Sequence, residues 1–286
     1  MLQLKEIRKA YGKNVVLEGI NLSLANGIYG FLGANGVGKT TLFKIISGYI
    51  ADYTGDVVYP QHNENKENLM GFLPQNFSGY PEMTISQFLI YMGTIKAKIS
   101  ENEVEQDVKE KMDLFNLTDI KDKKLKVLSG GQLRRVGLAQ AFQLNPHIVL
   151  LDEPTLGLDP SERIKFKNYI SSAGHNQIIL ISTHIVSDLE AISNEIYILK
   201  NRYFVMNGTE ESLLNKCKGC VWEAEFENEE QLRQFIGIDT VSSLYDYKNN
   251  IKARIISTVS PVPNAVSVKP TLEDVYMMNF KKGGYV

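Results

Sequence analysis

Hydrophobic and polar residues follow one pattern over most of the chain and a different pattern toward its C-terminus. In the first part, short apolar runs at 27–33, 147–153 and 178–183 alternate with longer segments in which apolar residues recur at helical spacing. Such runs are typical of buried parallel strands, and their alternation with helices is typical of an α/β fold. We therefore predict an α/β domain over residues 1–210 and a smaller domain over residues 211–286.

The C-terminal pattern predicts a small α+β domain. The segment VWEAEF (221–226) alternates like a half-buried strand, and the later segment YDYKNNIKARII contains Asn249 and Asn250, which are typical of a hairpin turn. A final strand is expected at AVSV. After it, Thr271 can cap a short helix that has two acidic residues in its first turn.

Two further helices are expected in the middle of the first domain. Apolar residues have helical spacing over 83–98 and over 104–115. Ser100 and Glu103 have the spacing of a capping box just before the second of these segments. The polar stretch at 61–68 is expected to be a solvated loop.

Composition indicates a globular protein and disfavours nucleic-acid-binding and membrane-spanning classes. The 286 residues are 43% hydrophobic, which is ample for a packed core, and 31 basic against 33 acidic side chains give a formal net charge of −2. This balance disfavours nucleic acid as a partner, although it leaves room for a local basic patch. Because no apolar run approaches the roughly 18 residues of a membrane span, and the N-terminus lacks the apolar core of a signal peptide, we expect a cytoplasmic protein.

The two cysteines, Cys217 and Cys220, lie in the sequence CKGC. Such a pair could form half of a zinc site or a redox couple, but zinc requires two more ligands and the histidines are scattered along the chain. We expect two reduced thiols in a linker.

The strongest chemical signal is the stretch GANGVGKTT, which begins at Gly33. It matches the pattern G-x-x-x-x-G-K-[ST], follows an apolar strand and precedes a segment of helical periodicity. Glycines at Gly36 and Gly38 allow main-chain N–H groups to surround phosphates. Lys39 would reach the β- and γ-phosphates, and Thr40 would offer its hydroxyl to Mg²⁺.

A site that holds Mg²⁺ also needs a carboxylate at the end of a neighbouring strand. The sequence IVLLDEP supplies two carboxylates. Asp152 would orient the metal or its water, and Glu153 is the candidate base for an attacking water.

A second phosphate-seeking helix start is expected at LSGGQ. Ser129 and Gln132 have the spacing of a capping box, but Gly130 and Gly131 would each cost about 1 kcal/mol relative to alanine in a first turn. Glycine at these positions lets another group approach the main chain, and the positive end of the helix dipole favours an anion such as a phosphate. Whether this phosphate belongs to the same nucleotide or to another molecule's nucleotide stays open at this point.

GANGVGKTT, LSGGQ and IVLLDEP, in this order along the chain, resemble the nucleotide-binding subunit of an ATP-binding cassette (ABC) transporter over about the first 210 residues. The resemblance implies a P-loop ATPase core with a parallel sheet, an antiparallel N-terminal β part and a helical subdomain at about 76–140, followed by the small α+β domain. It also implies Mg²⁺-dependent hydrolysis of ATP.

Smaller elements of the same resemblance assign further roles. Tyr11 is similar to the aromatic residue that stacks on adenine, Gln75 to the glutamine that contacts Mg²⁺ and senses the membrane partner, Asp159 to the loop acid that communicates across the dimer, and His184 to the switch histidine at the γ-phosphate. The implied catalytic residues are Glu153, His184 and Gln75. The implied metal ligands are Thr40, Gln75 and Asp152. The implied nucleotide contacts are Tyr11, Asn35, Gly36, Gly38, Lys39, Thr40, Thr41, Ser129, Gly130, Gly131, Gln132 and Asp159.

The implied partners are a separate multi-spanning membrane permease and a second ATPase subunit, identical or related, bound head to tail on ATP. The chain would then lie at the inner face of the cell membrane through the permease. Its tail, KPTLEDVYMMNF, resembles the closing motif of bacterial exporter subunits for drugs, antimicrobial peptides and lipids. An importer subunit and a soluble, non-transport ABC ATPase are the alternatives, and Glu153 disfavours a switch that scarcely hydrolyses ATP. The transported substrate leaves no sequence signal.

Four apolar side chains near Gln75 have two interpretations. Most of this stripe is expected to be core, but some of its members could form a groove for a partner helix beside Gln75. The side chains are Phe77, Tyr80, Met83 and Phe88.

Overall fold

The chain forms two compact units, Met1–Phe204 and Val205–Val286, in the computed structural model. The structure describes residues 1–60, 70–96, 99–237, 240–247 and 250–280. The stretch expected to be a solvated loop at 61–68 lies outside these ranges. The change of sequence pattern near residue 210 coincides with the start of helix α6 (Glu210–Lys216), within the second unit.

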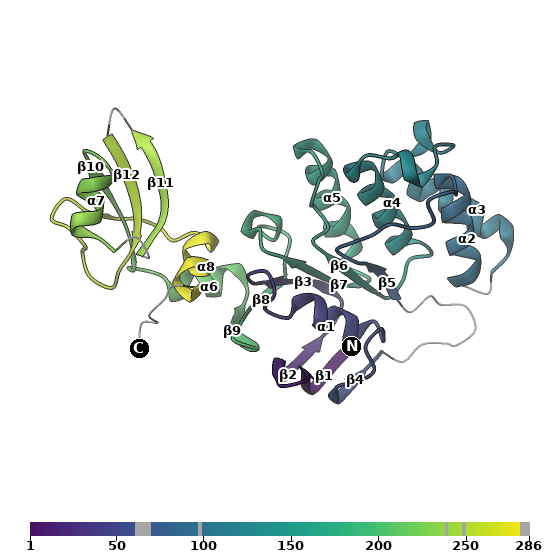
Figure 1. Ribbon diagram of the computed structural model, residues 1–286, viewed down its shortest axis with the longest axis horizontal. Helices are drawn as coiled ribbons and strands as arrows, with labels where there is room; N and C mark the ends of the chain where they lie inside the picture. Colours follow the sequence, from purple (N-terminus) through teal and green to yellow (C-terminus); the bar gives the residue numbers. More distant parts are fainter. Residues whose placement is uncertain (61–69, 97–98, 238–239, 248–249, 281–286) are drawn as a thin grey trace. The chain divides into compact units, whose positions relative to one another are not determined.

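A mainly parallel sheet forms the centre of the first unit (Figure 1). Its strands, in spatial order, are β5 (Met70–Leu73), β6 (Ile148–Asp152), β7 (Ile178–Thr183), β3 (Gly27–Leu32), β8 (Glu195–Lys200) and β9 (Tyr203–Gly208). Every residue of β3, β6 and β7 is buried, and the pairings from β5 through β8 are parallel. The buried parallel strands predicted from the apolar runs are confirmed. Because parallel strands end at the same edge, the loops after β3 and β6 share that edge.

One face of this sheet carries helix α1 (Lys39–Ile46) and an antiparallel sheet (Figure 1). The antiparallel sheet has the strand order β2 (Asn14–Leu24), β1 (Leu2–Tyr11) and β4 (Thr54–Val58). Apolar side chains from these strands, α1 and the central sheet form one core. Phe31 lies within it, with its ring centroid 5.6 Å from that of Phe43 and 5.5 Å from that of Tyr197.

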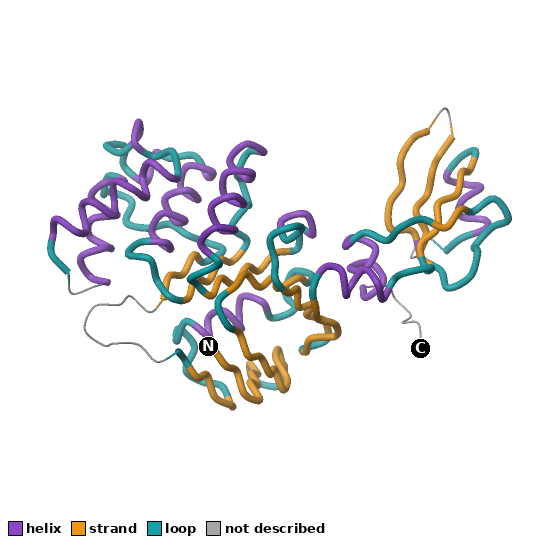
Figure 2. The backbone as a smooth tube through the Cα atoms, turned by 180° about the vertical axis from the view of Figure 1, so that it is seen from behind, coloured by secondary structure: helices purple, strands orange, loops and turns teal. Residues whose placement is uncertain are grey.

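The other face carries the longer helices, as Figure 2 shows from behind. These are α2 (Ile85–Lys96), α3 (Glu101–Leu114), α4 (Gly130–Phe142) and α5 (Pro160–Ala173), with short 3₁₀ turns at Thr118–Ile120, Leu125–Val127 and Val186–Asp188. The helices expected over 83–98 and 104–115 are confirmed with shifted bounds. The second begins earlier than expected because Ser100 and Glu103 form the predicted capping box, which places the first turn directly after Ser100.

The second unit contains an antiparallel sheet with the strand order β11 (Val241–Tyr247), β12 (Asn250–Ile256), β10 (Val221–Phe226) and β13 (Val266–Ser267). Its helices are α6, α7 (Glu229–Phe235) and α8 (Leu272–Phe280). The predicted Thr271 cap is confirmed, since its hydroxyl accepts the N–H of Asp274 at 3.4 Å. The predicted hairpin is confirmed, because β11 and β12 are consecutive antiparallel strands, but Asn250 pairs with Tyr247 as the first residue of β12 and is not part of a turn. Asn249 lies outside the described residues.

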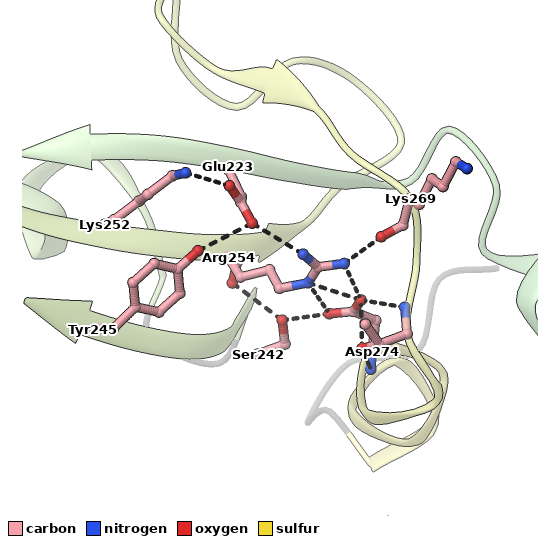
Figure 3. Close-up of polar contacts among 8 residues, drawn as sticks. Glu223, Ser242, Tyr245, Lys252, Arg254, Lys269 and Asp274 are labelled. Atoms are coloured by element: carbon pink, nitrogen blue, oxygen red, sulfur yellow. Dashed lines mark hydrogen bonds and ion pairs between the residues drawn. The ribbon is translucent and has the colours of Figure 1, made fainter. Parts of the chain in front are cut away.

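A polar network fastens α8 to the sheet of the second unit (Figure 3). Arg254 donates through Nε to Asp274 Oδ2 at 3.0 Å and through Nη1 to Glu223 Oε1 at 3.0 Å, and Ser242 donates to Asp274 Oδ1 at 2.6 Å. Burial disfavours the charged form of Arg254, but its hydrogen bonds to Asp274 and the two nearby carboxylates raise its pKa above the ordinary value. The guanidinium is therefore matched by opposite charge on both sides.

The cysteine pair belongs to this folded unit. Cys217 is fully buried directly after α6, so the prediction that it lies in a linker is wrong. Both cysteines are free, and burial raises the pKa of Cys217 to about 11. Among the residues that the structure describes, no group of three or more His, Cys, Asp or Glu side chains is arranged to hold a metal ion.

Candidate functional site

The glycine-rich loop joins the carboxyl end of β3 to the first turn of α1. Gly36 and Gly38 have φ of +79° and +116°, a region that side-chain-bearing residues rarely adopt. Gly38 is the N-cap of α1, and no side chain caps this helix. A Cβ at Gly38 would lie 2.9 Å from Leu17 Cδ2, so the loop could not keep this course with a larger residue. The N–H groups of the first turn are consequently available to an anion.

Lys39 lies inside the loop, with only 6% of its surface exposed. Its ammonium donates to the carbonyl oxygens of Gly33 at 2.6 Å and Ala34 at 3.1 Å. Burial lowers its pKa, while the negative charges of Glu153 and Asp152 act in the opposite direction. The cation is thus held beside the loop by neutral carbonyls, which a phosphate could replace as partners.

Thr40 and Asp152 meet across the sheet edge although they are far apart in sequence. The hydroxyl of Thr40 donates to Asp152 Oδ2 at 2.7 Å, and that of Ser182 donates to Asp152 Oδ1. Asp152 is 1% exposed. A hydroxyl and a carboxylate side by side are hard oxygen donors, and this donor set fits Mg²⁺.

Glu153 follows Asp152 with an unusual main-chain conformation. Its φ is +54°, and its carboxylate is buried. Oε1 lies 2.9 Å from His184 Nδ1, and Thr183 donates to Oε2 at 3.4 Å. Since a carboxylate only accepts hydrogen bonds, Nδ1 of His184 carries the proton in this pair. The histidine therefore orients the carboxylate of the candidate base.

These groups meet in one cavity of about 250 Å³. Its lining residues are Asn35, Gly36, Gly38, Lys39, Thr40, Thr41, Gln75, Asp152 and Glu153. Each of them was selected from the sequence as a candidate site residue. His184 is not among these lining residues, but its Nδ1 contacts Glu153 Oε1.

The other candidate residues are not part of this lining. Tyr11 is half exposed at the end of β1, where the ammonium of Lys9 lies 4.7 Å from its ring centroid. Asp159 is the N-cap of α5, and its Oδ1 accepts the N–H of Glu162 at 2.8 Å, which holds the pKa of Asp159 below its usual value. Tyr11 and Asp159 could therefore contact a nucleotide only with a part of it that extends outside this cavity.

The LSGGQ segment forms the first turn of α4, as its pattern predicts. Ser129 Oγ accepts the N–H of Gln132 at 3.3 Å, and Gln132 Oε1 accepts the N–H of Ser129 at 3.1 Å. The two glycines differ. A Cβ at Gly131 would lie 2.5 Å from the carbonyl oxygen of Gly157, whereas a Cβ at Gly130 would meet open space. Gly131 therefore serves a close approach within the chain, a role that its spacing did not indicate.

The aromatic residues near Gln75 divide between core and surface. Phe88 is 2% exposed, and its ring lies 5.8 Å from that of Phe77 and 6.2 Å from that of Tyr80. Tyr80 is half exposed and lies edge to face with Tyr91 at 5.5 Å, also exposed. Phe88 is thus core, Phe77 and Met83 are partly buried, and Tyr80 and Tyr91 provide exposed aromatic surface.

One buried side chain at this site was absent from the sequence interpretation. Arg134, on α4, donates to main-chain carbonyls of both the Gln75 segment and the segment that carries Asp152 and Glu153. The sequence does not distinguish a buried arginine that binds main-chain carbonyls from an arginine on the exposed face of a helix. The reason is that the carbonyl acceptors lie on other segments of the chain.

A glycine-rich loop between a strand and a helix, a lysine within it, and a hydroxyl beside an aspartate from a neighbouring strand end define a P-loop site for a nucleoside triphosphate. Among the described residues, no helix is long and apolar enough to cross a membrane.

Comparison with known proteins narrows this class. The family model described as ABC transporter matches residues 17–156. The lipopolysaccharide export system ATP-binding protein LptB of Escherichia coli (strain K12) is 31% identical over 223 residues, which are 74% of this chain and 92% of LptB. The linearmycin resistance ATP-binding protein LnrL of Bacillus subtilis (strain 168) is 29% identical over 226 residues, which are 77% of this chain and 72% of LnrL.

Among solved structures, the dimeric bacterial ABC transporter cassette MJ0796 superposes with a TM-score of 0.66 at 24% identity, covering 73% of this chain and 98% of the cassette. This likeness concerns the fold. Together with the sequence relatives, it confirms the predicted fold class. The chain belongs to the ABC transporter family, as a subunit that binds and hydrolyses ATP.

Proposed function

We propose that this chain powers a separate membrane permease that exports a drug, peptide or lipid, and that it does so as a head-to-tail dimer closed by ATP. The observation that carries the proposal is the convergence of Lys39, Thr40, Asp152 and Glu153 on one cavity. These four side chains supply a phosphate cation, two metal-side oxygen groups and a base, which are the parts that phosphoryl transfer to water requires.

The proposed division of roles follows from the contacts. The N–H groups of the loop and Lys39 bind the β- and γ-phosphates, for which the lysine exchanges its present carbonyl partners. Thr40, Asp152 and Gln75 would hold Mg²⁺, which when bound neutralises charge on the phosphates. Glu153 accepts a proton from the attacking water, and His184 holds Glu153 Oε1 in place.

The proposed dimer assigns a role to the N-terminus of α4. α1 already offers its uncapped N-terminus to the nucleotide of its own chain, so the N-terminus of α4 at Ser129 would serve the nucleotide of the other chain. Each ATP would then be bound by both subunits and would stabilise the closed dimer, and hydrolysis would remove that stabilisation. The dimeric structure of the MJ0796 cassette supports this assembly.

The direction of transport rests on the relatives. The names of LptB and LnrL refer to export and to resistance, and the tail of this chain resembles exporter subunits. The permease would dock near Gln75, and the exposed aromatic pair Tyr80 and Tyr91 would contribute to this contact. Through this contact the chain would lie at the cytoplasmic face of the membrane.

A test uses the chain with and without membrane protein. Affinity capture from native membranes is expected to retain a multi-spanning subunit, and the chain alone is expected not to bind protein-free liposomes. Reconstituted with that subunit, the chain should drive ATP-dependent movement of a fluorescent amphiphile out of the ATP-containing compartment, and Glu153→Gln should abolish the movement. Binding of the lone chain to liposomes, or movement toward the ATP, would contradict the proposal.

A further inference from the structure

Arg134 makes an unusual set of contacts for a buried charge. It lies in α4 and is 6% exposed. Its Nη1 donates to the carbonyl oxygens of Pro74 at 2.8 Å and Gln75 at 3.1 Å. Its Nη2 donates to those of Asp152 and, at 2.5 Å, Glu153, and its Nε donates to that of Pro154 at 3.4 Å. One guanidinium thus joins α4 to two other segments, 74–75 and 152–154, through main-chain acceptors alone.

The central acceptor of this set is the residue with the unusual backbone. Glu153 has φ of +54°, a left-handed conformation that is unfavourable for a residue with a Cβ. Such a conformation persists only where its surroundings hold it. Its N–H donates to the carbonyl of Ser182 at 2.9 Å, and Arg134 binds its carbonyl oxygen and those of both its chain neighbours.

We propose that Arg134 is a positioning residue for ATP hydrolysis, which holds the backbone of Glu153 so that its carboxylate faces the site and ties that backbone to the segment at Gln75. This inference rests on the proposed role of Glu153 as the base. It adds that α4, which begins at the LSGGQ segment, and the Gln75 segment control the direction of that base through one side chain.

The chemistry of arginine suits this task. A guanidinium presents five N–H donors in a rigid fork, whereas lysine presents one nitrogen at the end of a flexible chain and cannot bridge the same separated carbonyls. Burial lowers the pKa of Arg134 to about 10, opposed by the charges of Asp152 and Glu153, so the side chain stays protonated near neutral pH.

The next residue along α4 provides a matched control. Arg135 donates to the carbonyl oxygens of Phe115 at 3.1 Å and Asn116 at 2.7 Å, and pairs with Glu162 at 2.9 Å. It is the same residue type on the same helix, but its bonds lead away from Gln75 and Glu153. Loss of an arginine from α4 can therefore be separated from loss of the contacts to Glu153.

A double-mutant cycle tests the inference. The wild type, Arg134→Met, Glu153→Gln and the double variant are compared by single-turnover hydrolysis of radiolabelled ATP and by steady-state kinetics where turnover is measurable. Arg134→Met is expected to lower kcat by about 10²-fold, the order of loss that follows a small misplacement of a catalytic group, with KM and the Kd for fluorescent ATP within about twofold of wild type. In the Glu153→Gln background the same change should cost less than about threefold, because the group that it positions is gone. Arg135→Met should leave kcat unchanged.

A second readout does not involve activity. Amide hydrogen exchange of the segment around Pro74 and Gln75 should become faster in Arg134→Met and stay unchanged in Arg135→Met. If Arg134→Met fails to fold, as judged by thermal unfolding, Arg134→Lys keeps the charge and should show the same non-additive loss of kcat.

Three results would overturn the inference. Additive losses in the cycle would show that Arg134 does not act through Glu153, and a rise in KM with unchanged kcat would assign it to binding instead. Full hydrolysis by Glu153→Gln would refute the proposed base, and the inference with it. Additive losses together with a slow Glu153→Gln variant would refute the inference alone.

Discussion

The sequence predicts a phosphate-binding N-terminus for both α1 and α4, yet the two N-termini are capped differently in the structure. The N-cap of α1 is Gly38, which has φ of +116° and makes no side-chain cap. The N-cap of α4 is Ser129, which forms a complete capping box with Gln132. The first end leaves its N–H groups to a ligand, whereas the second already satisfies the N–H groups of Ser129 and Gln132 from its own side chains.

In the proposed dimer, this difference would separate a site that one chain completes from a site that a second chain completes. Around α1, the same chain supplies Lys39, Thr40 and the carboxylates of Asp152 and Glu153. Around α4, the capping box leaves the N–H groups of the first two helical residues to other acceptors, and no residue of LSGGQ lines the described cavity. The comparison supports the proposal that α1 binds the nucleotide of its own chain and that α4 contacts nucleotide only in the proposed dimer.

The largest expected effect is at the α1 end. Lys39→Ala should weaken ATP binding and abolish turnover, because it removes the cation that the loop holds at the phosphate position. Isothermal titration and ATPase rates measure both effects. Lys44→Ala, near the other end of the same helix, is the control and should bind ATP normally. Wild-type affinity and turnover in Lys39→Ala would show that the N-terminus of α1 does not bind the phosphates.

The next effect separates binding from chemistry at the α1 site. Glu153→Gln should keep ATP binding but lose about 10²–10⁴-fold in turnover, the range credited to general bases. Direct binding of fluorescent ATP and steady-state hydrolysis give the two quantities. Normal turnover would transfer the role of base to His184, which lies 2.9 Å from Glu153.

A substitution at the α4 end should affect assembly alone. Ser129→Arg in a Glu153→Gln background should still bind ATP as a monomer through Lys39, but should not close into a dimer. Light scattering with and without Mg-ATP measures this, since Glu153→Gln alone is expected to about double its mass with nucleotide. If the double variant dimerises normally, or loses ATP binding as a monomer, the partner role of α4 is wrong.

The smallest effect distinguishes the two glycines of the α4 end. Gly131→Ala should lower the free energy of unfolding by about 1–3 kcal/mol, as overpacking does, because its Cβ would lie 2.5 Å from the carbonyl oxygen of Gly157. Gly130→Ala should be neutral or raise that free energy by up to about 1 kcal/mol, since the new methyl meets open space in a helix. Urea unfolding of the two variants measures the difference. Equal losses would mean that the Gly157 contact does not matter.

Two arginines, Arg134 and Arg254, differ in the groups that hold them. Arg254 is matched by Glu223 and Asp274, which raises its pKa, and it ties α8 to the sheet of its unit. Arg134 is bonded to neutral carbonyls, and burial lowers its pKa to about 10. Because the guanidinium of Arg134 binds main-chain carbonyl oxygens, it constrains the position of that backbone directly.

Features that depend on neighbours along the chain were predictable from the sequence. The glycine-rich loop, the buried strands before and after it, and the capping boxes at Ser100 and Ser129 all follow from spacings of a few residues. The physical reason is local: a cap joins a residue to the one three positions later, and a strand buried on both faces needs a continuous apolar run. The fold class and all the residues that line the cavity were therefore predictable from the sequence, some of them only through the family resemblance.

Contacts between distant segments were decided by the tertiary structure alone. Thr40 meets Asp152 across 112 positions of sequence, Gly131 approaches Gly157, and Arg134 collects carbonyls from segments up to 60 positions away. The folded position of Cys217 and the pairing of Asn250 with Tyr247 also escaped the local patterns. The reason is that main-chain carbonyls are identical in every residue, so a sequence does not reveal which of them a buried guanidinium or a glycine will meet until the strands and helices are packed.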